Sequence, residues 1–325
     1  MRSDSDDVGL SGVAGVLARR RRDLTELAGA GLLSSPPQAL AAFGFEHAHV
    51  CDASCRPGEM ALDAARSAMS DAGLQPHEID VLVWASARPE SHLCSANGAT
   101  GTDSGDLLHG FRYSSAWLQD ALDLHNAEVM AVAQQGCATM FTALRTARAI
   151  LLAEPGRRHA LCVGVDVLPP NASREILYNV VSDAACAVVV SRGCAREKWR
   201  GYRQLSRGYY WDPAARGPEI VAAYFPTAKV VIDQLLTAHG LQPDDIDAVV
   251  ATGVNRSSWD ILMRLVGIPE DRLFRALPPF GHTITADSFL YLEELRRLGQ
   301  FERGSKLLLF TYGFGSSWCG LLLEH

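Results

Sequence analysis

An internal repeat most limits the folds that this chain can adopt. The segment GLQPHEIDVLVWAS starts at Gly73, GLQPDDIDAVVATG starts at Gly240, and the two agree at seven of fourteen positions. Each copy follows a stretch with the apolar spacing of an amphipathic helix, 59–72 and 228–239. Each then passes through a Gly-Leu-Gln-Pro turn into a short apolar strand. The repeat predicts two similar halves.

The elements that follow each copy come in a similar order. In the first half AEVMAVAQ, an expected strand, leads to Gly136 and Cys137, a helix over 138–152 and two buried strands. In the second half RLFRALPPF leads to Gly281 and His282, a helix and two further apolar strands. The alternative is that the fourteen-residue match reflects only a sequence pattern common to many helix-turn-strand units. The similar order of the following elements argues against it. Alternating helices and apolar strands predict an α/β fold with covered sheets.

The repeat also suggests the domain boundaries. We expect residues 1–44 to form a partly mobile N-terminal segment, 45–205 the first half and 206–325 the second. A linker rich in Gly, Pro and aromatic residues, 206–219, opens the second half. The small polar stretch 95–110 is an expected loop, either a pocket cover or a plain surface insertion.

Composition excludes several classes of protein. With 325 residues, 48% hydrophobic and 21% charged, the chain can bury a large core. A net charge of −7 gives no basic field for nucleic acid, so a small molecule or a carrier protein is the expected partner. The acidic start does not resemble a signal peptide, and no run of about 18 apolar residues occurs. A soluble cytoplasmic protein with no membrane partner is expected.

The cysteines indicate a reducing compartment. Eight are scattered along the chain, and most lie in apolar runs such as ALCVGVDV and AACAVVV, where free thiols behave as small hydrophobes. Cys51 and Cys55 form one close pair, but no second pair at zinc spacing lies nearby. No metal site is expected.

Cys137 is the candidate nucleophile. It lies in QQGCATMFTAL, between an extended apolar segment and the start of a long helix. A thiol in the first turn of a helix feels the positive end of the helix dipole, which favours the thiolate. The other seven cysteines lack this combination of preceding glycine, strand end and helix start. A buried structural cysteine is the alternative.

Four segments resemble β-ketoacyl-ACP synthase III: QQGCATMFTAL, ALCVGVDVL, VVSDAACAVVVS and TYGFGSSWCG. They occur in the family order, and the resemblance covers roughly 45–325. It implies a thiolase-like fold of duplicated halves in a layered αβαβα arrangement, a homodimer, and an acyl thioester on Cys137. The donor would be coenzyme A or a phosphopantetheine carrier, with no permanently bound cofactor. The backbone N–H groups of Cys137 and Phe314 would form the oxyanion hole.

The chain departs from that family at two positions. In place of its His-x-x-Asn pattern the chain reads TGVN, with Thr252 and Asn255 as site neighbours. In place of its Gly-Asn-Thr pattern it reads FGHTITAD, which puts His282 at the asparagine position. Asp287, five residues on, could orient the imidazole, although a solvated helix-start carboxylate is an equal alternative. The trio with Cys137 resembles the Cys-His-Asp acyltransferase offshoot of antibiotic biosynthesis.

Three functions follow as hypotheses. The first is an acyltransferase that passes an acyl group from Cys137 to a hydroxyl, an amine or a carrier in a biosynthetic pathway, of polyketide or antibiotic type. The second is a ketosynthase III-type enzyme of decarboxylative condensation, against which Thr252 and His282 argue. The third is an inactive partner subunit, against which the intact Cys137 argues.

Two further features have competing interpretations. The arginine run 19–22 could contact the phosphates of coenzyme A or an acidic carrier, but a solvated helix face is favoured. The aromatic residues Trp84, Tyr113 and Trp117 could line an acyl pocket, with core packing as the default.

Overall fold

The computed structural model describes residues 7–51, 55–87, 111–193, 195–274, 280–299 and 301–325. Its centre is a mixed sheet of ten strands in the order β12-β11-β13-β14-β10-β1-β9-β6-β4-β5. The strands of this sheet are β1 (Val8–Leu17), β4 (Val81–Ser86), β5 (Glu128–Ala133), β6 (His159–Asp166), β9 (Ala184–Arg192), β10 (Glu197–Ser206), β11 (Ala248–Val250), β12 (Leu273–Phe274), β13 (Lys306–Gly313) and β14 (Ser317–Glu324). Two small sheets pair β2 (Arg20–Asp23) with β3 (His47–Val50), and β7 (Glu175–Ile176) with β8 (Asn179–Val180).

The sheet is built twice from the same plan. Strand β4 runs parallel to β5 and β6, just as β11 runs parallel to β12 and β13. Outward from the centre, β1-β9-β6-β4-β5 therefore mirrors β10-β14-β13-β11-β12. The repeat copies occupy equivalent places: Gly73 (φ 69°) ends α3 (Pro57–Ala72) before β4, and Gly240 (φ 66°) follows α6 (Gly217–Ala238) before β11. The predicted duplication is confirmed.

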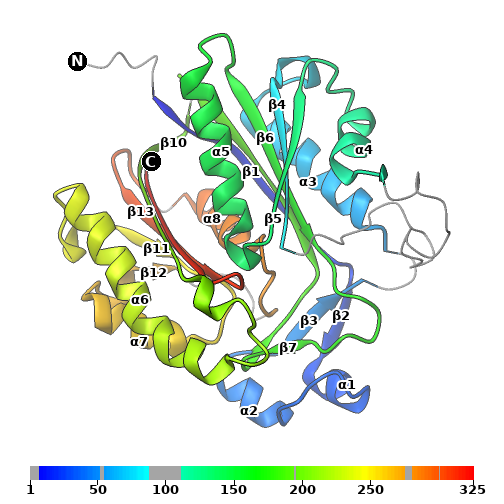
Figure 1. Ribbon diagram of the computed structural model, residues 1–325, viewed down its shortest axis with the longest axis vertical. Coiled ribbons are helices and arrows are strands. Elements are labelled where there is room, and N and C mark those ends of the chain that lie inside the picture. Colours follow the sequence, from blue (N-terminus) through cyan, green and yellow to red (C-terminus); the bar gives the residue numbers. More distant parts are fainter. Residues whose placement is uncertain (1–6, 52–54, 88–110, 194, 275–279, 300) are drawn as a thin grey trace.

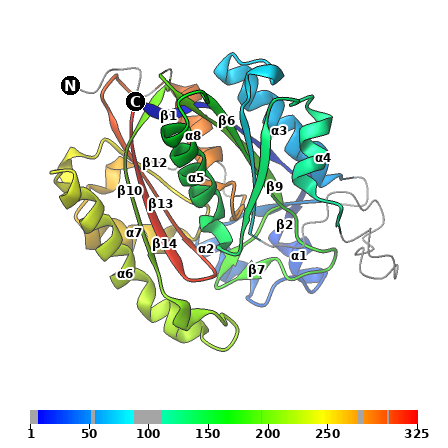
Figure 2. The same ribbon diagram turned by 45° about the horizontal axis from the view of Figure 1, so that its top comes forward.

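Helices form three layers around the bent sheet. Helices α5 (Thr139–Ala153) and α8 (Asp287–Leu298) lie between its two arms, where the rings of Phe141 and Phe289 are 5.7 Å apart (Figure 1). Helices α3 and α4 (Ser114–Ala121) cover the outer face of one arm (Figure 2). Helices α6 and α7 (Arg256–Val266) cover the other. Apolar side chains fill each interface, so the αβαβα expectation is confirmed.

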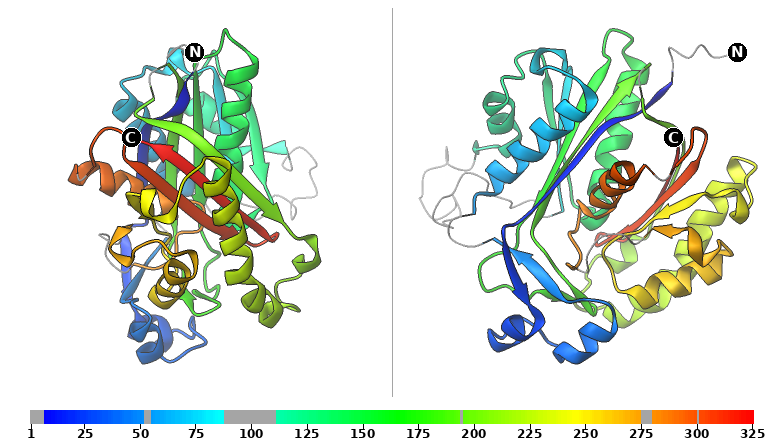
Figure 3. Two further views of the ribbon diagram at one scale, coloured as in Figure 1. Left: turned by 90° about the vertical axis from the view of Figure 1, so that its left-hand side faces the viewer. Right: turned by 180° about the vertical axis from the view of Figure 1, so that it is seen from behind.

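The N-terminal stretch joins the halves. Strand β1 lies between β9 and β10, with Gly9 opposite both Ser191 and Lys198 (Figure 3, right). Two short helices, α1 (Leu24–Gly29) and α2 (Pro37–Ala42), follow at one end of the molecule. Residues 7–44 are therefore part of the core architecture rather than a loose segment. This central place of β1 has no local sequence signal, because both partner strands lie far away along the chain.

Several local expectations need correction. Helix α6 begins at Gly217, inside the predicted linker 206–219. Residues 20–22 belong to strand β2, with exposed or half-buried side chains, rather than to a helix face. Cys51 and Cys55 form a disulfide. Among the described cysteines, the expectation of free thiols is therefore confirmed only for four buried residues, Cys137, Cys162, Cys186 and Cys319. The loop expected at 95–110 lies outside the described residues.

One helix of the described chain passes a simple length-and-composition test for a membrane span. It is α6, with a mean hydropathy of 1.2 over its best window. Its apolar stripe, which includes Val231, Ile232 and Leu235, packs in the core against β10 and β14. Core helices of this kind meet the same test, so the finding is weak support for a membrane contact.

Candidate active site

Cys137 lies where β5 passes into α5. It is the middle residue of the single 3-10 turn Gly136–Ala138 and is only 8% exposed. Gly136 has a φ of +52°, and a Cβ there would collide with the backbone nitrogen of Phe314. The hydroxyl of Thr139 donates to the Gly136 carbonyl over 2.7 Å and fixes the turn. The glycine before the cysteine is thus required both by its φ and by the close approach of a second turn.

His282 is held by a short strand-like contact ahead of α8. Its N–H donates to the Val180 carbonyl (2.6 Å), and its own carbonyl accepts from the Ser182 N–H (2.9 Å). The preceding Gly281 has a φ of +85°, and a Cβ there would lie 2.6 Å from the Val180 oxygen. A glycine again precedes the functional side chain and lets two backbones approach.

The structure brings Cys137, His282 and Asp287 into one hydrogen-bonded row. Cys137 Sγ lies 2.9 Å from Nε2 of His282, whose Nδ1 is hydrogen-bonded to Asp287 Oδ2. The other carboxylate oxygen, Oδ1, accepts from the N–H and the hydroxyl of Thr283, each over 2.6 Å. All three side chains are buried, so Asp287 is not a solvated carboxylate.

The row sets the charge of the imidazole. Burial by itself lowers the pKa of His282, but the adjacent Asp287 carboxylate and Cys137 sulfur outweigh that effect and hold the pKa well above its ordinary value. The protonated imidazole is therefore favoured while these two partners flank it. An acyl group on Cys137 Sγ would leave the sulfur uncharged, and Cys137 would then no longer help to raise the pKa of His282.

Two backbone amides, those of Cys137 and Phe314, lie in turns that pack against each other. Phe314 lies in the turn between β13 and β14, which packs against the Cys137 turn: a Cβ on Gly313 would be 2.9 Å from the Cys137 nitrogen. Neither the Cys137 nor the Phe314 N–H donates to another described residue. Paired free amides of this kind suit a developing oxyanion.

Thr252 and Asn255 line the same pocket but differ in their contacts. Thr252 is buried, and its carbonyl accepts from the indole N–H of Trp259 over 3.0 Å. Asn255 is the N-cap of α7: its side-chain oxygen accepts from the Ser258 N–H (2.9 Å), and its own N–H donates to Asn179 (2.7 Å). Its amide is thus engaged at a helix start rather than in the catalytic row.

The pocket that ends at Cys137 has a volume of about 600 Å³ and draws on both halves. Its apolar and aromatic lining consists chiefly of Leu168, Ile176, Leu177, Tyr178, Trp211, Ile220, Val221, Tyr224, Phe225, Tyr312 and Phe314. The expected aromatic residues Trp84 and Trp117 instead pack in the core under α3 and α4. The pocket aromatics had no signal in the local pattern, because segments distant in sequence bring them together.

Asp166 is a site neighbour that the sequence analysis missed. It ends strand β6 at 2% exposure and accepts from the Ala87 N–H (3.1 Å), the Thr285 N–H (3.2 Å) and the Thr285 hydroxyl (2.5 Å). Burial raises the pKa of this carboxyl group. The contacts fix the chain three residues after His282. The sequence signal that could have identified Asp166 as a site neighbour is an aspartate at the end of a buried apolar strand.

The described residues contain no group of three or more His, Cys, Asp or Glu side chains that could hold a metal ion.

Comparison with known proteins finds similar chains along most of the sequence. The family model for the C-terminal part of 3-oxoacyl-[acyl-carrier-protein] synthase III matches residues 236–325. The β-ketoacyl-[acyl-carrier-protein] synthase III of Sphingopyxis alaskensis is 26% identical, over 97% of this chain and 98% of its own. That of Aquifex aeolicus is 22% identical, over 82% of this chain and 83% of its own.

Solved structures share the fold. The Aquifex aeolicus synthase III has a TM-score of 0.82 at 19% identity, covering 98% of this chain and all of its own. An acyltransferase, ChlB3, has a TM-score of 0.81 at 20% identity, with 98% and 97% covered. OleA of Xanthomonas campestris, solved with bound lauric acid and lauroyl-CoA, has a TM-score of 0.79 at 16% identity, with 99% and 100% covered. The chain is therefore a thiolase-fold enzyme, similar along nearly its whole length to the ketosynthase III family.

Proposed function

We propose that this enzyme is an acyltransferase: it takes an acyl group from a coenzyme A or acyl-carrier-protein thioester onto Cys137 and passes it to a hydroxyl, an amine or a carrier. The observation that carries the proposal is the row Cys137–His282–Asp287, with its sulfur-to-nitrogen distance of 2.9 Å. A neutral imidazole oriented by a carboxylate is suited to remove a proton from an alcohol or an amine.

The first half-reaction loads the enzyme. The Cys137 thiolate adds to the donor thioester carbonyl, and the amides of Cys137 and Phe314 stabilise the oxyanion. As the intermediate collapses, the donor C–S bond breaks, and the protonated His282 gives its proton to the leaving pantetheine sulfur. The raised pKa of His282 supports its role as the acid in this step. The products are acyl-Cys137 and a free thiol.

The second half-reaction releases the acyl group. With the sulfur acylated and uncharged, neutral His282 takes the proton of the acceptor O–H or N–H while that oxygen or nitrogen adds to the carbonyl carbon. The bond between the acyl carbon and Cys137 Sγ then breaks, which releases the ester or amide and returns the thiolate beside the newly protonated imidazole. Throughout both half-reactions Asp287 accepts a hydrogen bond from His282 Nδ1, which keeps that proton on the ring and fixes the ring orientation.

Thioesters are the donors expected from the relatives. The curated relatives are named as β-ketoacyl-[acyl-carrier-protein] synthases III, and one protein of this fold was solved with lauroyl-CoA. We extend the same donor classes to this chain, with no permanently bound cofactor. A place in polyketide or antibiotic biosynthesis belongs to the proposal as well. A protein named as an acyltransferase, ChlB3, has the same fold and is compatible with it.

The proposal includes a homodimer. Strand β5 is the last strand of the sheet, paired with β4 on one side and with no strand on the other among the described residues. Val129, Met130 and Val132 of this edge are only half-buried in the single chain. An uncovered apolar edge strand is suited to pairing with a second copy.

Decarboxylative condensation is the second candidate, because the curated relatives are named as β-ketoacyl-[acyl-carrier-protein] synthases III, the family whose resemblance to this sequence implies that reaction. The specific observation against it is the position taken by Thr252, which offers no imidazole beside the pocket. Condensation needs two neutral donors on the enolate oxygen, and His282 is the single histidine that lines this pocket among the described residues.

Intact-mass measurement tests the proposal. Purified protein is exposed to a panel of acyl-CoA and acyl-ACP donors, and then to amine and alcohol acceptors. We expect one covalent acyl adduct on Cys137, lost on adding an acceptor together with formation of the ester or amide. An adduct on another residue, or none with any donor class, would refute the function.

A further inference from the structure

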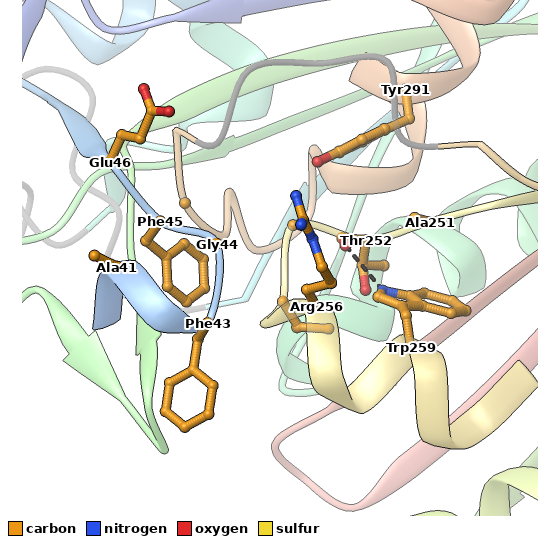
Figure 4. A pocket seen from close by; sticks show the side chains of 13 residues that line it. Ala41, Phe43, Gly44, Phe45, Glu46, Ala251, Thr252, Arg256, Trp259 and Tyr291 are labelled. Carbon is orange, nitrogen blue, oxygen red and sulfur yellow. Dashed lines mark hydrogen bonds between the residues drawn. The ribbon is translucent and has the colours of Figure 1, made fainter. Parts of the chain in front are cut away.

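A second pocket lies behind the loop that carries His282. It has a volume of about 510 Å³ and is formed by the chain after α2, the end of β11, the start of α7 and helix α8 (Figure 4). Its lining includes Phe43, Arg256, Trp259 and Tyr291. No role in the transfer chemistry described above uses this pocket.

The first turn of α7 separates the two pockets. Asn255 and Ser258 line the nucleophile pocket, whereas Arg256 and Trp259 line the second. Thr252 lines both. The two spaces therefore adjoin at Thr252, beside the catalytic row.

On the other side of Thr252, the two pockets are separated by the backbone of two glycines. Gly253 and Gly281 pack against one another: a Cβ on Gly253 would lie 2.6 Å from the Gly281 oxygen and 3.0 Å from Asp287 Oδ1. Gly281 lines the second pocket, and the side chain of the next residue, His282, lines the first. A ligand in the second pocket would thus lie against the segment that presents the imidazole.

The second pocket contains a cation that the first one lacks. The described lining of the nucleophile pocket includes no lysine or arginine. The Arg256 side chain reaches into the second pocket toward Tyr291, and its guanidinium forms no ion pair with a described carboxylate (Figure 4). Glu46 points away in the same view and lies 4.0 Å from Arg21. An unpaired guanidinium in a pocket is suited to a carboxylate or a phosphate.

Three aromatic residues, Phe43, Trp259 and Tyr291, belong to the lining of this pocket. Trp259 is only 3% exposed, and its hydrogen bond to Thr252 holds it in the core below β13, while the Phe43 ring lies 6.2 Å from that of Tyr178. With Arg256 as the cation of its described lining, the pocket fits a small ligand that carries one anionic group.

We propose that the second pocket binds the acyl acceptor: Arg256 holds its carboxylate or phosphate, and its hydroxyl or amine reaches past Thr252 to His282. This inference rests on the proposed transferase function. The donor acyl chain fills the uncharged nucleophile pocket, and the acceptor takes the adjoining charged one. Proton and acyl transfer then proceed as in the second half-reaction.

The binding test uses three matched probes: benzyl alcohol, 4-(hydroxymethyl)benzoate and 4-(hydroxymethyl)phenyl phosphate. Protein labelled with 5-fluorotryptophan reports occupancy through the fluorine resonance of Trp259, assigned with Trp259→Phe. We expect the anionic probes to bind about ten- to hundredfold more tightly than benzyl alcohol, as a hydrogen-bonded charge pair implies. The tighter of the two identifies carboxylate or phosphate as the preferred group.

Three arginine variants complete the test. Arg256→Gln should weaken the anionic probes about tenfold or more, and Arg256→Lys should weaken them less. Arg264→Gln is the matched control, because Arg264 is exposed on the same helix and lies 3.6 Å from Glu270, outside the pocket. It should bind all probes as the unaltered protein does.

Single-turnover release measured on isolated acyl-enzyme then tests the acceptor role. The anionic probes should speed loss of the Cys137 adduct, and Arg256→Gln should remove that advantage over benzyl alcohol. Equal binding by the Arg256 and Arg264 variants would overturn the anion site. Binding without faster release would overturn the acceptor role, as would an Arg256→Gln effect on loading from acyl-CoA instead of on release. Failure of Cys137 to acylate at all would instead count against the transferase function, while the binding result would still stand.

Discussion

The two halves present their functional residues from equivalent points but in different ways. In the first half Gly136 is followed by Cys137 inside a turn that continues directly into α5. In the second half Gly281 is followed by His282, and α8 begins only at Asp287. The extra residues let the first carboxylate of α8 reach back to the imidazole. The duplicated frame thus sets where the two side chains meet, and the local chain before each helix sets what chemistry each performs.

The largest expected effect comes from removing the first-half residue. Cys137→Ala should abolish acyl loading, because no other thiol among the described residues lines the pocket. The fold should lose only about 1 kcal/mol, since one small buried residue replaces another. Intact mass after exposure to acyl donors and thermal unfolding measure the two effects. An adduct on the alanine variant would place the nucleophile elsewhere.

Removing the second-half residue should separate the two half-reactions. His282→Ala should still acquire some adduct at Cys137, but release to an acceptor should fall about 10²- to 10⁴-fold, the usual contribution of a general base. Quenched-flow mass spectrometry follows both steps. If His282→Ala slowed loading and release equally, His282 would not act mainly as the base of the release step.

A smaller loss is expected when the carboxylate is neutralised. Asp287→Asn keeps the shape but removes the charge that orients the imidazole, so release should slow by less than in His282→Ala. The pH profile of release should also move to lower pH, because Asp287 helps to hold the pKa of His282 above its ordinary value. An unchanged profile would separate Asp287 from the row.

The two glycines allow a direct test of the equivalence of the halves. Gly136→Ala and Gly281→Ala should each cost about 2–3 kcal/mol and impair the site, since a Cβ collides with Phe314 or Val180. Gly73→Ala is the matched control: its φ of 69° is also left-handed, but no atom lies within 4 Å of the added carbon. It should cost only about 1 kcal/mol. Urea unfolding gives the comparison, and equal costs at all three positions would show that strain alone accounts for them.

The smallest expected effect is the pH dependence of stability. Because the folded pKa of His282 lies above 6.5, its charged interaction with Asp287 is fully present below that pH and is lost as the pH rises through the folded pKa. The difference in free energy of unfolding between the protein and Asp287→Asn should therefore be largest below pH 6.5 and shrink as the pH rises through the raised pKa of His282. A difference that grows with pH would contradict this sign.

The sequence predicted much of the row because its signals are local. A glycine, a reactive side chain and a helix start lie within a few residues of one another at Cys137, and Asp287 is five residues from His282. The repeat predicted that the two segments face each other. These features need no knowledge of distant contacts.

What the sequence missed depends on distant pairing. The partners of β1 lie far away along the chain, from Ala184 opposite Leu17 (184 − 17 = 167 residues) to Lys198 opposite Gly9 (198 − 9 = 189 residues), so its central place has no local signal. The pocket residues Tyr224 and Tyr312 come from a helix and a strand that meet only in the folded chain. The Cys51–Cys55 disulfide was missed because most of the other cysteines lie in apolar runs typical of free thiols, and that interpretation was extended to this pair.

The central claim is that the row serves acyl transfer rather than condensation. The most direct measurement gives acylated protein labelled malonyl-ACP in one reaction and an amine or alcohol acceptor in another, and follows carbon dioxide and product together. The account predicts little decarboxylation and ester or amide formation that requires His282. Rapid carbon dioxide release with a β-ketoacyl product, and full turnover by the Asp287→Asn variant, would contradict it.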